Sequence, residues 1–211
     1  MSLGKARWFA ALWWCCASCS MAAAPDFVGA RASDDVRYAA GWVLDGADNR
    51  GKPFVIVDKR EARVYVFEAG GRLMGATSAL LGLTTGDQSI PDIASRAPAS
   101  LRPSERTTPA GRFDSQPGHN AKGEDIVWVD YDASLAMHRL RPAPPAERRR
   151  ERLASASVDD KRISLGCIVL PVAFYDEVVG PLLGRQRGVI YVLPEARPAR
   201  ELFGDLQVGL R

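Results

Sequence analysis

Short runs of β-branched and aromatic residues dominate the first half of the chain. Phe54–Asp58 and Ala62–Phe67 are two such runs, and a charged turn separates them. A glycine-rich turn, Ala69–Arg72, precedes a third apolar stretch, Leu73–Leu81. Runs of this length between turn residues are typical of strands. The pattern therefore predicts a three-stranded meander.

The second half continues with strands and adds two helical stretches. Strands are predicted after the turn at Thr107–Phe113 and at the four runs Asp125–Tyr131, Ala133–Leu140, Ile168–Leu170 and Gly188–Leu193. Ala146–Ala154, which follows two prolines, predicts a short polar helix, and Pro171–Leu183 has apolar residues at helical spacing. We expect a mainly β domain with one or two short helices.

Four segments lack a sustained period. Residues 25–52 are interpreted as a lead-in or linker with little regular structure, and residues 197–211 as a C-terminal tail. Residues 82–106 form a long loop rich in Gly, Pro, Ser and Thr, and loops of this length are usually functional or disordered. Residues 142–160 interrupt the strands; their arginines are typical of a solvated face, and the alternative is a rim that meets an anionic polymer.

Composition excludes few classes of protein. The chain has 211 residues, 46% hydrophobic and 25% charged, with a formal net charge of +3, which is ordinary for one soluble domain. No basic stripe interleaved with aromatic residues indicates a nucleic-acid partner. No nucleotide-binding glycine motif, HExxH or CxxC pair occurs after the N-terminal region, so nucleotide and zinc sites have no support.

The N-terminus predicts export. Lys5 and Arg7 precede a short apolar run over residues 8–17, and small residues follow up to Ala24. We therefore expect residues 1–24 to be a signal peptide and the protein to act in the periplasm or cell envelope. Cys19 leaves open a lipid anchor, so membrane contact is expected only through the signal or such an anchor.

Cys167 is the candidate for chemistry. Cys15, Cys16 and Cys19 cluster near the N-terminus, so processing there leaves Cys167 as a lone thiol. The apolar residues after it favour packing as a small buried side chain. The small residues in Ser164-Leu165-Gly166-Cys167 favour a nucleophile beside an oxyanion site formed by backbone N–H groups. The residues alone leave both readings open.

Four features in order resemble the catalytic domain of the L,D-transpeptidase family (YkuD type). They are the opening strands, the segment Thr108–Phe113 (like TPxGxF), a histidine at a strand end, His138, and the SxGC segment ending at Cys167. The resemblance covers about residues 53–194, so the catalytic domain is expected over residues 53–196, and it implies a YkuD-like β-sandwich or barrel of mixed sheets. His119, in a Pro-Gly-His-Asn loop without a matching motif, is expected at the surface.

The resemblance also implies roles for individual residues. Cys167 would attack a peptidoglycan tetrapeptide stem, release D-Ala and hold the stem as a thioester, with His138 handling protons. Gly166 and Ser164 would shape the turn and the oxyanion site, and Arg162 and Leu165 would contact substrate. The acceptor would be an amine of a second stem, giving a 3-3 crosslink, or of a wall-attached protein. No metal or organic cofactor is implied.

Departures from the family pattern leave alternatives open. Leu165 and Val169 replace residues that are often polar in the family, and residues 142–160 lengthen the gap between histidine and cysteine and could act as a lid. A hydrolase of the same fold, either an L,D-carboxypeptidase or an amidase that detaches wall-bound protein, would use water as the acceptor. A non-catalytic wall-binding module would keep only the fold.

Overall fold

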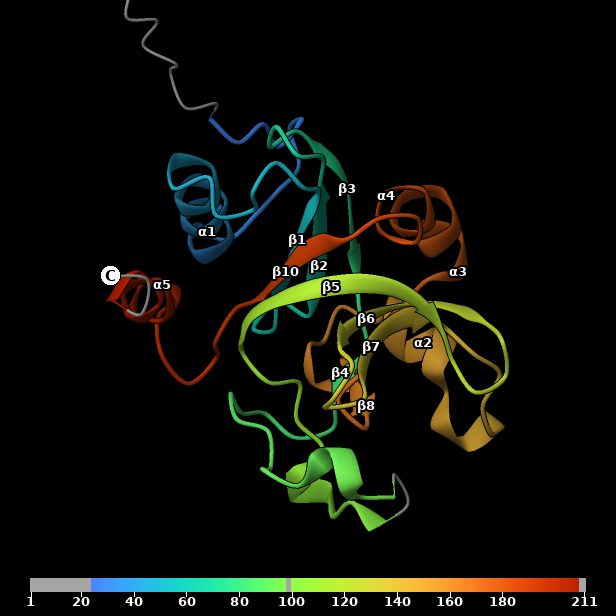
Figure 1. Cartoon of the computed structure of the whole chain (residues 1–211). Helices are drawn as coiled ribbons and strands as arrows, with labels where there is room; N and C mark the ends of the chain where they lie inside the picture. Colours follow the sequence, from blue (N-terminus) through green and yellow to red (C-terminus); the bar gives the residue numbers. More distant parts are fainter. Residues whose placement is uncertain (1–23, 98–99, 209–211) are drawn as a thin grey trace, which may run out of the picture.

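The computed structural model describes residues 24–97 and 100–208, and its main feature is a strongly curved eight-stranded sheet (Figure 1). The predicted export signal, including Cys15, Cys16 and Cys19, lies outside the described residues apart from Ala24. The strands are β1 (Phe54–Asp58), β2 (Arg63–Phe67), β3 (Leu73–Ser78), β4 (Leu81–Gly82), β5 (Gly111–His119), β6 (Asp125–Asp130), β7 (Leu135–Arg139), β8 (Arg162–Ser164), β9 (Ile168–Leu170) and β10 (Gly188–Val192).

The helices are short and lie mostly around the sheet. They are α1 (Asp34–Asp45), α2 (Arg149–Ala154), α3 (Val172–Phe174), α4 (Gly180–Leu183) and α5 (Ala199–Val208), with a π-helical turn, η6 (Tyr175–Val179), joining α3 to α4. Short 3₁₀ turns occur at η1 (Ile93–Ser95), η3 (Pro103–Glu105), η4 (Pro145–Glu147) and η5 (Asp159–Lys161). None of the helices in the described ranges combines the length and apolar character needed to cross a membrane.

The sheet is mixed and nearly closed. Its order is β3-β2-β1-β10-β5-β6-β7-β9, with β1 and β10 parallel, β7 and β9 parallel, and the other neighbours antiparallel. Leu80, just after β3, exchanges two backbone hydrogen bonds of 2.9 Å with Val169 of β9, which links the two edges. The meander β1-β2-β3 and the mainly β fold class with mixed sheets and few short helices are confirmed.

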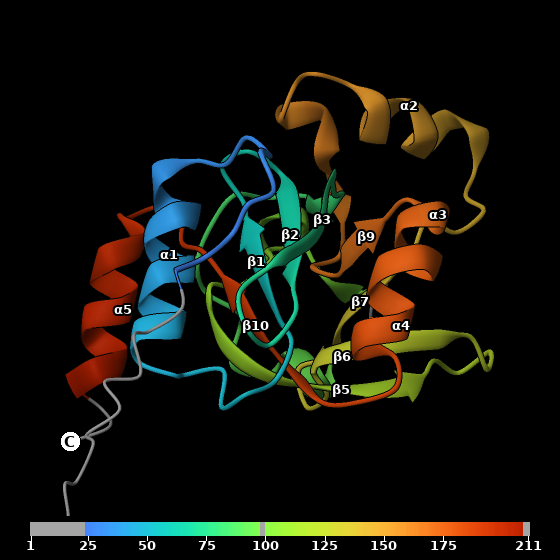
Figure 2. The same ribbon diagram turned by 90° about the horizontal axis from the view of Figure 1, so that it is seen from above.

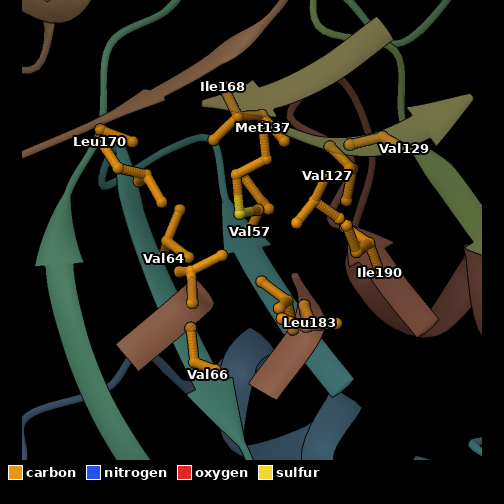
Figure 3. Packing of buried hydrophobic residues seen from close by; sticks show 14 of the residues in the cluster. Val57, Val64, Val66, Val127, Val129, Met137, Ile168, Leu170, Leu183 and Ile190 are labelled. Carbon is orange, nitrogen blue, oxygen red and sulfur yellow. The ribbon is translucent and has the colours of Figure 1, made fainter. Parts of the chain in front are cut away.

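One apolar core fills the concave side of the sheet. Alternate residues of the strands point into it, and the α3–α4 segment contributes Tyr175, Val179 and Leu183. Figure 3 shows the inward side chains converging from both halves of the sheet: Val57, Val64, Val66, Val127, Val129, Met137, Ile168, Leu170 and Ile190. This core fixes the position of β7 and β9, which carry the candidate chemistry.

A second core lies on the other face of β1, β2 and β10, under α1 and α5 (Figure 2). Ser33 caps α1 by accepting a hydrogen bond from Val36 N, and the helix buries Val36, Ala39, Ala40 and Val43. The expectation of little regular structure over residues 25–52 is therefore wrong. Residues 197–211 likewise contain α5, whose Ala199 and Phe203 join this core.

The other helical predictions hold with shorter bounds. The polar helix expected at Ala146–Ala154 is α2 preceded by η4, and the apolar spacing over Pro171–Leu183 forms α3, η6 and α4. Within the described part of residues 82–106, regular structure is limited to Gly82 at the end of β4 and to 3₁₀ turns.

Candidate active site

The turn before Cys167 is held by its own polar groups. Ser164 Oγ donates to the carbonyl of Cys167 at 2.7 Å and accepts from Gly166 N at 3.0 Å. Gly166 has φ +138°, and a Cβ there would stand 2.8 Å from Thr107 O. Only glycine fits this backbone and this close approach. The expected turn-shaping role of Ser164 and Gly166 thus has a geometric basis.

Thr108 joins this turn to a distant segment of the chain. Its buried hydroxyl donates to Gly166 O at 2.8 Å and accepts from Gly82 N at 2.9 Å. The Thr108–Phe113 segment and the SxGC segment, although far apart in sequence, therefore lie against each other. Thr108 therefore holds the Gly166 carbonyl, while Ser164 holds the Gly166 N–H.

A buried charge cluster lies behind Thr108. Lys59 Nζ is fully buried and donates to Thr108 O at 2.9 Å, Gly86 O at 2.6 Å and Asp87 Oδ1 at 2.8 Å. Arg162 donates to Glu195 Oε2 at 2.6 Å and to Lys59 O at 2.7 Å. Arg162, expected to contact substrate, is thus buried in an ion pair and does not line the pocket at Cys167.

Cys167 opens onto a pocket of about 200 Å³. The thiol is free and partly exposed, and its Sγ lies 3.8 Å from Ser134 O. Burial of its surroundings raises the pKa of the Cys167 thiol, while the Ala136 N–H and the charge of Arg141 oppose that shift. The resting side chain is therefore a thiol, with a backbone N–H already directed at the sulfur.

His138 lies on β7, the strand next to Cys167. It is in register with Val169, so His138 and Cys167 are on the same face of the β7–β9 pair, two positions apart along it. His138 Nδ1 lies 2.7 Å from Arg139 O. Because a carbonyl only accepts, Nδ1 carries the proton and Nε2 of the neutral ring is free to accept one.

Burial is also the main reason that the pKa of His138 is lowered to about 4. The nearby charges of Arg141 and Arg149 lower the pKa further, whereas the Arg139 carbonyl and Glu124 raise it. The imidazole is therefore neutral at pH 7. No hydrogen bond joins His138 and Cys167 within the described residues, and His138 lines a neighbouring pocket of about 350 Å³. The pair is not a preformed thiolate–imidazolium.

The other residues considered in the sequence analysis lie in different environments. Leu165 is 42% exposed and lines the Cys167 pocket, as its expected contact with substrate requires. The Gly166 N–H, an expected oxyanion donor, is bound to Ser164 Oγ, so an oxyanion would share or displace that bond. His119 lies at the surface, 3.0 Å from Asp125. No cluster of three His, Cys, Asp or Glu side chains suited to a metal occurs in residues 24–97 and 100–208.

Sequence reasoning missed one wall of the Cys167 pocket. Residues of the long loop line it, and they are Ser89, Ile93, Arg96, Leu101 and Glu105. Glu105 is buried and bound by Arg102 at 2.6 Å and Arg96 at 3.4 Å, which fixes the loop. No local pattern marked these residues, because the contact depends on how the loop returns to the sheet.

The insert, residues 142–160, covers part of the same face. Leu153 of α2 is buried with Val169 and Leu80 in a small apolar cluster, and Figure 2 shows α2 on the β9 side of the molecule. Val169, where the resemblance leads one to expect a polar residue, is thus the contact point of the insert. Val169 and the insert, which are both departures from the family pattern, therefore contact each other.

Comparison with known proteins gives no family model and no curated protein that matches this chain. Among solved structures, three similar ones align at 16% identity. An Ldtfm–avibactam carbamoyl enzyme has a TM-score of 0.39, with 68% of this chain and 49% of that chain covered. An Enterococcus faecium L,D-transpeptidase with a cysteine-to-serine mutation has 0.37, with 67% and 50% covered.

The third, an NMR structure of the catalytic domain from E. faecium L,D-transpeptidase, has a TM-score of 0.37, with 68% of this chain and 98% of that chain covered. The alignments with the first two span only about half of those chains, 49% and 50%. Matches at this identity and these TM-scores establish neither the family nor an activity of this chain.

Proposed function

We propose that this protein is an exported cysteine acyltransferase of the L,D-transpeptidase type that acts on peptidoglycan stems in the cell envelope. The observation that carries the proposal is the partly exposed Cys167 at a pocket, with the Ala136 N–H directed at its sulfur and neutral His138 on the same strand face. A structural cysteine needs none of these features.

The reaction would begin from the neutral pair. A bound stem excludes water, and His138 Nε2 takes the thiol proton as the sulfur attacks the carbonyl of the third residue. The C–S bond forms, the C–N bond to D-Ala breaks, and the proton passes to the departing amine. The acceptor amine then attacks the thioester, gives a proton to His138, and the thiolate leaves and is reprotonated.

The pocket fits an extended peptide better than a charged small molecule. Its lining is mainly apolar and includes Ile93, Leu101, Pro109, Leu135 and Leu165. An apolar slot with few polar contacts orients a peptide mainly by shape. The amine acceptor, whether from a stem or a wall-attached protein, would approach from the other side of His138.

The test is acylation of the mature protein. We expect a carbapenem-type acylating drug to add its mass at Cys167, and tetrapeptide stems to lose D-Ala with formation of a crosslinked product. Cys167→Ala should lose the adduct and at least about a thousandfold of the activity, with unchanged thermal unfolding. A folded wild-type protein that forms no adduct and releases no D-Ala would sink the proposal, and release without a crosslink would assign a hydrolase.

A further inference from the structure

A further pocket, of about 530 Å³, lies between the insert and the end of β7. Four guanidinium groups line it, and we call it the arginine pocket: Arg141, Arg148, Arg149 and Arg150. Its apolar lining comes from Leu140, the neighbouring prolines and Val172, which is 46% exposed. Glu151 is the one acidic residue among the described residues that line it.

Half of these arginines have no partner for their charge. Arg141 pairs with Glu124 at 2.8 Å, and Arg149 pairs with Glu147. The side chains of Arg148 and Arg150 are exposed and make no hydrogen bond or ion pair with any residue of the described ranges. A concave site with two unpaired guanidinium groups attracts an anion, and planar guanidinium forks suit a carboxylate.

The arginine pocket adjoins the pocket that His138 lines. It shares Leu140, Arg141 and Pro142 with the pocket that His138 lines. The charges of Arg141 and Arg149 are also felt at His138. The Cys167 pocket lies at the other end of the β7–β9 pair, beside Ser134 and Leu135. His138 thus stands between the two pockets.

We propose that the arginine pocket binds the free carboxylate of the acceptor stem, an inference that rests on the proposed transpeptidase function. The donor must place its carbonyl at Cys167, so the acceptor amine has to arrive beside His138, which takes its proton. A carboxylate held by Arg148 and Arg150 would direct that amine, while the aliphatic part of the diamino acid lies on Val172 and the prolines.

The test variant is Arg148→Asn with Arg150→Gln. Arg148 has a left-handed backbone, φ +46°, which asparagine tolerates, so the substitution removes charge without adding strain. The matched control is Arg50→Asn with Arg185→Gln, because Arg50 is also exposed with φ +52° and both residues lie outside the insert. Both double variants lower the net charge equally.

The kinetic readout separates donor from acceptor. With a tripeptide stem as acceptor, the pocket variant should show about a tenfold higher KM for that stem, while drug acylation of Cys167 stays at the wild-type rate. When the acceptor carboxylates are amidated, the pocket variant, the control and the wild type should be equal. An unchanged KM for the free acid would overturn the inference.

A binding readout works without turnover. In a Cys167→Ala background, the labelled tripeptide should bind about tenfold more weakly to the pocket variant than to the control, by fluorescence anisotropy. Binding of the amidated peptide as tight as binding of the free acid would also overturn the inference. Displacement by single-stranded DNA or anionic vesicles regardless of amidation would do the same. If wild-type protein fails to acylate, the proposed function fails, and this binding result still decides whether the pocket holds a carboxylate.

Discussion

In the central strands of the sheet and in those near its edge, successive residues point to opposite faces, but what covers the outer face differs. In β1 and β10 every residue is buried, because α1 and α5 cover one face and the main core covers the other. In β7 and β9 the inward residues, such as Met137 and Ile168, join that core, but the outward positions carry His138 and, just before β9, Cys167. Adjacent residues of one strand therefore face the core on one side and the candidate site on the other.

Substituting a residue that faces the core should lower the stability without changing the reactivity of Cys167. Ile168→Ala removes a fully buried side chain, so we expect the free energy of unfolding to fall by about 4 kcal/mol, measured by urea denaturation. The folded fraction should still react with an acylating drug at Cys167, because Ile168 faces away from the pocket. A loss below about 1 kcal/mol would contradict the assignment of Ile168 to the main core.

The outward-facing His138 should make the stability of the folded state depend on pH. Because burial lowers the pKa of His138 from 6.5 to about 4, the unfolded chain binds a proton first as the pH falls below about 6.5. The folded state is therefore destabilised progressively down to pH 4, by about 3 kcal/mol in total.

The measurement is urea denaturation at pH 7 and pH 4.5. His138→Gln should lose most of this residue's share of the pH dependence, whereas His119→Gln, at an exposed position, should behave as the wild type. If wild type and His138→Gln lose the same stability between the two pH values, the assignment of a neutral, buried imidazole to His138 is wrong.

The smallest effect is expected at Thr108, whose hydroxyl links Gly166 to Gly82. Thr108→Val keeps the shape but leaves Gly166 O and Gly82 N without their partner. We expect a loss of about 1–2 kcal/mol in stability and about tenfold slower acylation of Cys167. The Thr107 hydroxyl donates to Gln88 O near the surface, so Thr107→Val should lower the stability by less than about 0.5 kcal/mol. Equal effects of the two variants would contradict the proposed positioning by Thr108.

Strands were predictable from the sequence because they are short runs of β-branched and aromatic residues bounded by turn residues. The helix α1 was missed although its signals are present: Ser33 as cap, acidic residues in the first turn, and apolar residues at helical spacing. Gly41 and Gly46 favoured turns, and tertiary packing against β1 outweighs the helix cost of Gly41. The tail helix α5 is too short to predict without its partner surface.

Parts of the candidate site could not be predicted, because they depend on contacts between distant segments. Motif resemblance selected Cys167 and His138, whose catalytic roles stay predictions. No pattern could place Arg162 in an ion pair with Glu195, or Leu153 against Val169. Burial of a charge or an apolar residue depends on which segment folds over it, and local periodicity carries no such information.

The buried charge cluster sets a limit on how short a folding unit can be. Lys59 and Arg162 share the carboxylates of Asp87 and Glu195, and Glu195 lies two residues beyond the last strand-side leucine, Leu193. A chain that stopped at Pro194 would leave two enclosed cations with one counter-charge, which is strongly destabilising. The segment after the last strand is therefore required for its carboxylate at Glu195 as well as for the apolar side chains of α5.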